Sequence, residues 1–383
     1  MSPRFIIDGS TIRETRDPGE SERPRKRPRQ DSSDSPLGSY SSTWRFVDTG
    51  TTWTSDVVMD EEFYREDGDC KIRVGKTGFL VHRRHLVEAS PVLKQIIESY
   101  PPDCVVSLVV DVDEFRALCW ALYATPEAIF TAAVQDHDTV SRLLLLASAT
   151  HQFRCSALSS LVHSSLRTII SSPSFSASCS SALFTRFVDT AVKTRNDALL
   201  EATVTTWSAR LQTNDIPCVP AILAADTHDL STLRGVAYYH HVQTLLAEEG
   251  TNSRGATVFR TEQLTKLSNA QVTRLLSGHW SLVSLCEQLK RRAVAFVGPE
   301  GCAGQCSSVW MERWAAIARS ERVGGLRAAA LLRLLGAIRQ MATADAEIKA
   351  RMCEGCRQAA LDALEKRALE LEDGLADHFF GWL

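Results

Sequence analysis

The sequence predicts an α+β protein in which a small mixed sheet with helices is preceded by a disordered tail and followed by an all-α C-terminal domain. Three patterns support this prediction. Residues 1–55 show no sustained hydrophobic period, residues 70–81 alternate as a half-buried strand does, and apolar residues beyond 182 recur with a helical period. The predicted parts are a tail at 1–55, an α+β domain at 56–170, a Ser-rich linker at 171–181 and a helical domain at 182–383.

Composition limits the classes of protein to which the chain can belong. Its 383 residues are 44% hydrophobic and 23% charged, which is enough apolar material for two domains of ordinary size. The net charge of -3 gives no overall attraction to nucleic acid or anionic lipid. Residues 1–10 contain no apolar core of a secretory signal, and no apolar stretch is long enough to span a bilayer. We therefore expect an intracellular protein without membrane attachment, whose eleven cysteines are mostly reduced.

The tail contains a basic cluster. Its cations, separated by prolines, are Arg23, Arg25, Lys26, Arg27 and Arg29. A basic segment held extended by prolines is typical of nuclear localisation signals and of phosphate-binding tails. Solvated charge without a function is the alternative. Nucleus, cytoplasm or both are the expected compartments.

The elements of the first domain follow one another closely. Cys70, Ile72 and Val74 alternate with basic residues, and residues 79–81 follow a glycine-bearing turn, which predicts a β-hairpin. Residues 82–89 predict a helix, and Ser90 followed by proline predicts the N-cap of a second one. A β-branched run predicts a third strand, and Asp111 predicts the start of the next helix. The remaining expected ranges are strand 105–110 and two amphipathic helices within 140–169.

The C-terminal part is expected to contain helices and no strand. The predicted helices cover approximately 183–211, 219–225, 233–248, 262–297, 309–320, 326–341 and 347–371. The Ser-rich stretch at 171–181 is expected to be a loop or linker.

The order of hairpin, helix pair, strand and helix resembles a BTB/POZ domain over residues 68–166. The sequence departs from the family pattern at Leu93, where the family usually has Phe, and in the short loop 100–104. The C-terminal half resembles the helical region of mushroom-type fungal BTB proteins. The residues that carry the BTB resemblance are Asp69, Phe79, His82, Leu86, Ser90, Leu93, Phe115 and Tyr123.

The resemblance implies a homodimer that acts as an adaptor, either for a cullin-type ubiquitin ligase or for transcriptional co-regulators. It implies no catalysis, and His82 is expected to be a packed marker of the fold. The alternative function is a DNA-associated regulator that uses the basic tail for phosphate contact. Salt-dependent DNA binding would distinguish the two.

Four cysteines form the sharpest chemical motif. Cys302 and Cys306 are separated by three residues, and Cys353 and Cys356 by two. Two such pairs supply the four thiolates of a closed structural zinc site, which leaves no catalytic position. Buried thiols and redox pairing are the alternatives left open. Zinc is the only cofactor that the sequence suggests.

Other candidate motifs fit structural roles better. Gly75 and the following Lys-Thr lack the earlier glycine of a phosphate-binding loop and precede a strand instead of a helix. Trp310 and Trp314 share a helical face and are expected to anchor the core or an interface. His240 and His241 are expected at the surface or in a capping role, because neighbouring rings on a helix point to different sides.

Overall fold

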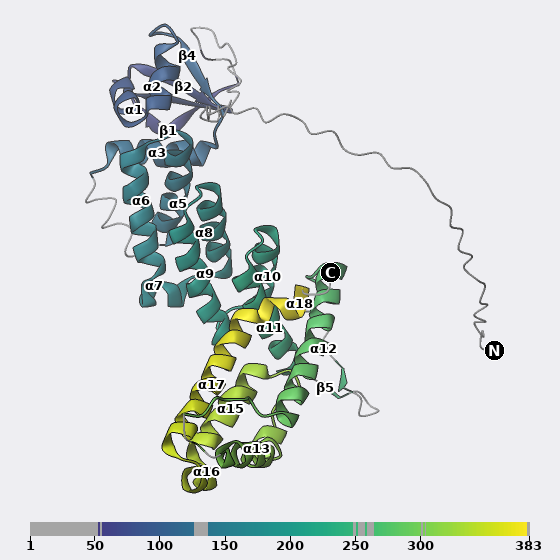
Figure 1. Cartoon of the computed structure of the whole chain (residues 1–383). Helices are drawn as coiled ribbons and strands as arrows, with labels where there is room; N and C mark the ends of the chain where they lie inside the picture. The colour runs from purple at the N-terminus through teal and green to yellow at the C-terminus, as the bar shows by residue number, and fades with distance from the viewer. Residues whose placement is uncertain are drawn as a thin grey trace, which may run out of the picture. The chain divides into compact units, whose positions relative to one another are not determined.

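The computed structural model of the chain describes residues 53, 56–125, 137–247, 250–251, 257–258, 264–299, 302 and 304–380. These residues all fall in one compact unit, which spans Phe46–Leu383 (Figure 1). The basic cluster at 23–29, like nearly all of the predicted tail, lies outside the described residues. Among the described residues, no helix has the length and apolar character needed to cross a membrane.

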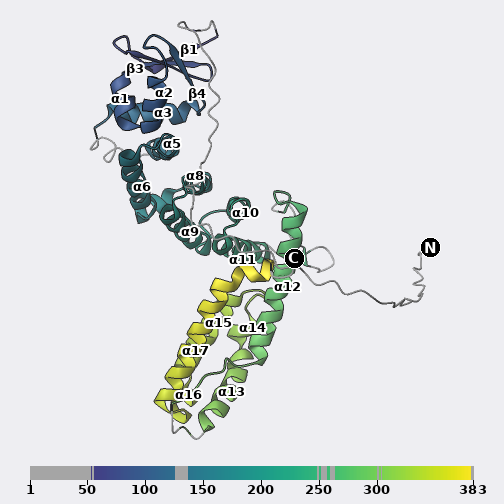
Figure 2. The ribbon, with the colours of Figure 1, turned by 45° about the horizontal axis from the view of Figure 1, so that its top comes forward.

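The first part of the unit is a four-stranded mixed sheet with helices beside it (Figures 1 and 2). The strand order is β1-β3-β2-β4, in which β2 and β3 form the predicted antiparallel hairpin and the outer strands pair in parallel. Gly75 has a φ of 59° in the turn, a left-handed conformation that glycine adopts without strain. The strands are β1 (Val58–Tyr64), β2 (Cys70–Val74), β3 (Thr77–Val81) and β4 (Val105–Leu108).

Strand β1 was not predicted. Its burial does not alternate with period 2, and its register against β3 shifts between Met59 and Tyr64, so the sequence pattern of a strand is broken. The strand is held in place by Asp60, whose buried carboxylate accepts a 2.6 Å hydrogen bond from Nε of Arg116. Its side chain thus links the edge of the sheet to helix α3 (Val112–Tyr123).

The predicted junction of two helices at Ser90 is confirmed. Ser90 is the N-cap of α2, and its Oγ accepts the backbone N–H of Leu93 while donating to the carbonyl oxygen of Phe153 at 2.5 Å. One hydroxyl therefore caps α2 and fastens it to the end of α5. The helices concerned are α1 (Arg83–Ala89), α2 (Pro91–Glu98), α5 (His137–Gln152) and α6 (Ser156–Ile170).

The helices that follow extend the same core. Helix α8 packs on α5 and α9 packs on α6, and Lys193 at the end of α8 forms an ion pair with Glu114 of α3. The Ser-rich segment, predicted to be a loop or linker, contains a short helix, because Ser172 and Pro173 provide a favourable helix start. These helices are α7 (Pro173–Ser178), α8 (Ser181–Lys193), α9 (Asp197–Gln212), α10 (Cys218–Thr227) and α11 (Ser231–Ala247).

Local backbone signals divide two of the predicted helices. The range 183–211 is two helices, since Arg195 has a φ of 53° and Asn196 caps α9 by accepting from Leu199 N–H. The range 347–371 is likewise broken before Glu354. The prediction of a strand-free C-terminal part was wrong in one place, where β5 (Gly250–Thr251) pairs with β6 (Thr257–Val258).

The last helices pack around buried tryptophans and leucines. Helices α15 and α17 lie side by side, and α13 contacts both α15 and α16 (Figures 1 and 2). Trp310 and Trp314 are buried as predicted, and their indole N–H groups donate to the carbonyl oxygens of Val294 and Leu289. The elements are α12 (Asn269–Arg291), α13 (Gln305–Ala318), α14 (Glu321–Gly324), α15 (Leu331–Ala344), α16 (Ala346–Arg351), α17 (Glu354–Asp373), η2 (Gly374–Ala376) and α18 (Asp377–Phe380).

Candidate metal centre

The structure brings the four predicted cysteines together. Every pair of their sulfur atoms lies within 4.8 Å, although the two cysteine pairs are far apart in the sequence. The sulfurs of Cys306 and Cys353 lie 3.8 Å apart. Two thiolates bound to one tetrahedral zinc ion at about 2.3 Å each are separated by about 3.8 Å. The cluster therefore has the size needed to hold a metal ion.

Each pair of cysteines lies where a helix begins. Cys306 is in the first turn of α13, and Gly304 before it has a φ of 78°, which allows the chain to turn sharply between Cys302 and Cys306. Cys353 is the N-cap of α17 and Cys356 lies in its first turn. Helix α17 begins at Glu354. Backbone N–H groups at a helix start favour negative charge and hence thiolates.

The electrostatics of the thiols are mutually dependent. A hydrogen bond with Cys356, followed by the backbone N–H of Gly304, lowers the pKa of Cys302 to about 7. Burial, followed by hydrogen bonds with the other cysteines, raises the pKa of Cys356. The backbone N–H of Cys353 also donates to the sulfur of Cys306 at 3.4 Å. The cluster therefore contains a thiol that ionises readily and a buried one that needs a bound cation to ionise.

Close packing surrounds the buried side of the cluster. A Cβ atom added to Gly298 would lie 2.8 Å from the Cys356 sulfur, so the chain before Cys302 passes directly against this thiol. Cys306 and Cys356 are buried, Cys302 is half-buried and Cys353 is exposed. A metal held here would be enclosed on one side and reachable from solvent on the other. Four sulfur donors suit zinc and other soft metals, and they leave no open position for a substrate.

The other cysteines differ from this cluster. All eleven are unpaired, and Cys119 and Cys155 are buried as predicted for small hydrophobic side chains. Burial raises the pKa of Cys70 to about 11 and that of Cys155 to about 11, which keeps these thiols protonated. These cysteines therefore fill the core.

The residues that carried the BTB resemblance also gather in one region. The carboxylate of Asp69 accepts the backbone N–H of Arg83 at 2.6 Å, which ties the start of β2 to α1. His82 is half-buried, and its backbone N–H donates to the Tyr123 hydroxyl. The apolar members are buried in the shared core, and these are Phe79, Leu86, Leu93 and Phe115.

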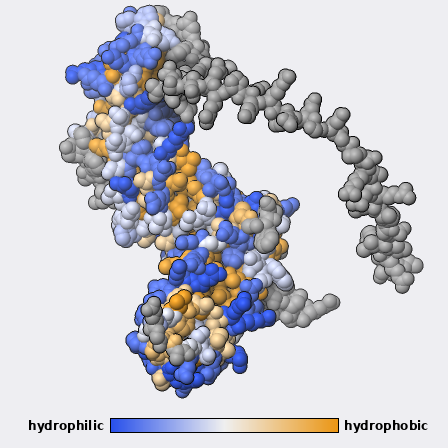
Figure 3. All heavy atoms as spheres, viewed as in Figure 1, coloured by the Kyte–Doolittle hydropathy of each residue, from blue (hydrophilic) through white to orange (hydrophobic). Residues whose placement is uncertain are grey.

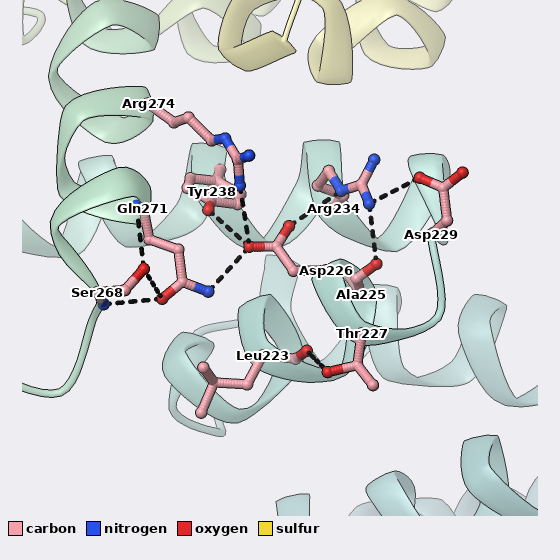
Figure 4. Close-up of polar contacts among 10 residues, drawn as sticks. All are labelled: Leu223, Ala225, Asp226, Thr227, Asp229, Arg234, Tyr238, Ser268, Gln271 and Arg274. Atoms are coloured by element: carbon pink, nitrogen blue, oxygen red, sulfur yellow. Dashed lines mark hydrogen bonds and ion pairs between the residues drawn. The ribbon is translucent and has the colours of Figure 1, made fainter.

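One polar cluster was not found from the sequence. Asp226 at the end of α10 accepts hydrogen bonds from Nε of Arg234 at 3.0 Å, from the Tyr238 hydroxyl at 3.0 Å and from Gln271 at 2.8 Å, and Arg274 lies 3.6 Å away (Figure 4). The arginines also lie over the ring of Phe380. This network joins α10, α11, α12 and α18. The sequence does not predict this network, because its residues lie on different helices that come together only in the folded structure.

The two neighbouring histidines correct another prediction. His241 is 1% exposed and His240 is also largely enclosed, so a surface or capping role is wrong for His241. Burial lowers the pKa of His241 to about 4, and burial together with Arg333 lowers that of His240 to about 4. Both rings are therefore neutral near pH 7.

No protein-family model matches the sequence, and a search of curated proteins finds no match.

Proposed function

We propose that this chain is a non-catalytic adaptor of the BTB/POZ type that dimerises and recruits a protein partner, with its C-terminal helices held together by a structural zinc ion. The observation that carries the proposal is the sequence of elements around Ser90. Hairpin β2–β3, helices α1 and α2, strand β4 and helix α3 follow in the order of the BTB resemblance. A partner of this kind is a cullin-type ubiquitin ligase or a transcriptional co-regulator, in the nucleus or the cytoplasm.

An exposed sheet edge supports dimerisation. Strand β1 is at one end of the sheet order, and Val58 at its start is 70% exposed. An edge strand with an exposed apolar residue is a ready surface for pairing with another chain. Hydrophilic side chains cover much of the face seen in Figure 3, with hydrophobic patches between them. A second copy at the β1 edge would cover Val58.

Sedimentation velocity of the full chain tests this proposal. We expect a dimer at micromolar concentration, weakened in Val58→Asp. Val297→Asp is the matched control, because Val297 is 91% exposed and lies in the segment after α12. A wild-type chain that stays monomeric at these concentrations would remove the support for a dimeric adaptor.

The zinc proposal rests on the four converging sulfurs. When bound, zinc would supply a fixed tetrahedral junction, and Cys302, Cys306, Cys353 and Cys356 would hold it. Because these ligands come from the starts of α13 and α17, the ion would join two helices that otherwise meet through side-chain packing. Cobalt(II) added to the metal-free chain should produce the absorption bands of tetrahedral thiolate coordination. Octahedral cobalt spectra would argue against a four-sulfur site.

A further inference from the structure

A cavity of about 780 Å³ opens where α9 connects to α10, away from both the cysteine cluster and the sheet. Residues 214–220 form much of its lining, and His241 and Thr244 of α11 also line it. This volume lies within the range of about 300–1,000 Å³ found for small-molecule sites. The cavity has no part in the proposed function.

The local sequence makes this side of the cavity rigid and apolar. Asn214 has a φ of 57° and ends α9 abruptly, and Pro217 and Pro220 flank the start of α10. Proline fixes its own φ and has no backbone N–H, so the lining offers few donors there. Together with Ile216, Val219 and Leu223, these prolines form an apolar surface.

The charged groups at the cavity favour an anion. Lys266 is exposed on the lining and forms no ion pair with any residue that the structure describes. The other charged lining residue, Asp215, is already engaged, since its carboxylate accepts from the Thr213 hydroxyl at 2.5 Å and lies 3.6 Å from Nε of Arg210. Among the described residues, the lysine is thus a cation without an ion-pair partner beside an apolar surface.

A buried polar group lies among the lining residues from α11. Nε2 of His241 has no hydrogen-bond partner among the described residues, although the side chain is 1% exposed. Buried polar atoms are seldom left unpaired in folded proteins, but this nitrogen has almost no accessible surface, so the ring must rotate before a bound polar group reaches it. The neutral ring can donate or accept a hydrogen bond if it turns toward the cavity.

We propose that this cavity binds a small amphipathic organic anion. The apolar body of the ligand packs on Pro217, Val219 and Leu223, and its carboxylate or sulfonate pairs with Lys266. One molecule binds per chain.

A matched pair of fluorescent probes tests the proposal on the full-length protein. 8-Anilinonaphthalene-1-sulfonate carries a sulfonate group. N-phenyl-1-naphthylamine has the same apolar rings without the sulfonate. Both should bind with one site per chain. Lys266→Gln should lower the affinity for the sulfonate probe about three- to fivefold, because the ion pair is lost. The affinity for the uncharged probe should stay unchanged.

A second variant tests the place of binding. Leu223→Trp should obstruct the apolar surface on which both probes pack and weaken the binding of both by about tenfold or more. Met311→Trp is its control, since Met311 is an exposed helical residue on α13, outside this cavity, with 56% exposure against 45% for Leu223. Binding that survives Leu223→Trp, an identical effect of Lys266→Gln on both probes, or no saturable binding in the wild type would each overturn the proposal.

Discussion

The Tyr123 hydroxyl accepts the backbone N–H of His82 and lies 2.9 Å from Nδ1 of the same residue, so one phenol bonds twice to the start of α1. A hydroxyl that accepts from the N–H can donate its own proton to Nδ1. In the neutral tautomer with its proton on Nε2, Nδ1 accepts from the phenol and Nε2 faces the carboxylate of Asp67 at 3.4 Å. The end of α3 and the start of α1 are thereby fixed to each other.

Tyr123→Phe should lower the free energy of unfolding by about 1–2 kcal/mol, because it leaves the His82 N–H and Nδ1 without their partner. Urea denaturation measures this change. Tyr64→Phe is the matched control, since Tyr64 is 38% exposed on the edge strand, and its loss should be within about 0.5 kcal/mol. Equal effects of the two substitutions would show that the bonds to His82 contribute nothing.

Ser90→Ala should lower the free energy of unfolding by more than substitution of an exposed serine does. It removes the cap of α2 and also leaves the Phe153 carbonyl oxygen without its donor, so we expect a loss of about 2–3 kcal/mol. Ser99→Ala, at the exposed end of the same helix, should cost less than about 0.5 kcal/mol. Thermal unfolding of both variants decides whether the Ser90 bonds matter.

Gly278 on α12 allows close packing of Phe379. A Cβ atom at this position would lie 1.9 Å from the phenyl ring, which is 3% exposed, so Gly278→Ala must displace it. We expect a loss of about 1–3 kcal/mol from this overpacking. Gly336→Ala on α15 meets no neighbouring atom and should instead stabilise by about 0.5–1 kcal/mol through helix propensity. Stabilisation by both alanines would contradict the packing of α18 on α12.

The buried histidines should make the fold sensitive to acid. The pKa of His241 is about 4 in the native state and about 6.5 when unfolded, so the unfolded chain binds the extra proton between these values. Stability is therefore lost as the pH falls from about 6.5 toward 4, by about 2 kcal/mol for this group at pH 5. Urea unfolding at pH 7 and pH 5 measures the free energy of unfolding at each pH. Its decrease between pH 7 and pH 5 should be smaller in His241→Gln and in His240→Gln than in wild type. An unchanged decrease in both variants would mean that neither ring is buried in the neutral form.

Local sequence patterns predicted the parts of the fold that local chemistry determines. Hairpin β2–β3 alternates with period 2, and Ser90 followed by proline marks a helix start by its own hydrogen bonding. Strand β1 was missed because its irregular register breaks that period. The Asp226 network and the cavity beside Lys266 could not be predicted, because each depends on helices that meet only in the tertiary structure. The spacing of the four cysteines did indicate a shared site, although not that the helix starts at Gly304 and Cys353 would bring the sulfurs together.

The zinc content of the purified full-length chain is the most direct test of the metal centre. We expect about one zinc per chain, lost together with thermal stability in Cys353→Ser and Cys356→Ser and retained in Cys104→Ser, a half-buried cysteine outside the cluster. A well-folded wild-type chain without zinc would contradict the account. Thiol titration of the denatured protein would then distinguish eleven free cysteines from a redox pair in the cluster.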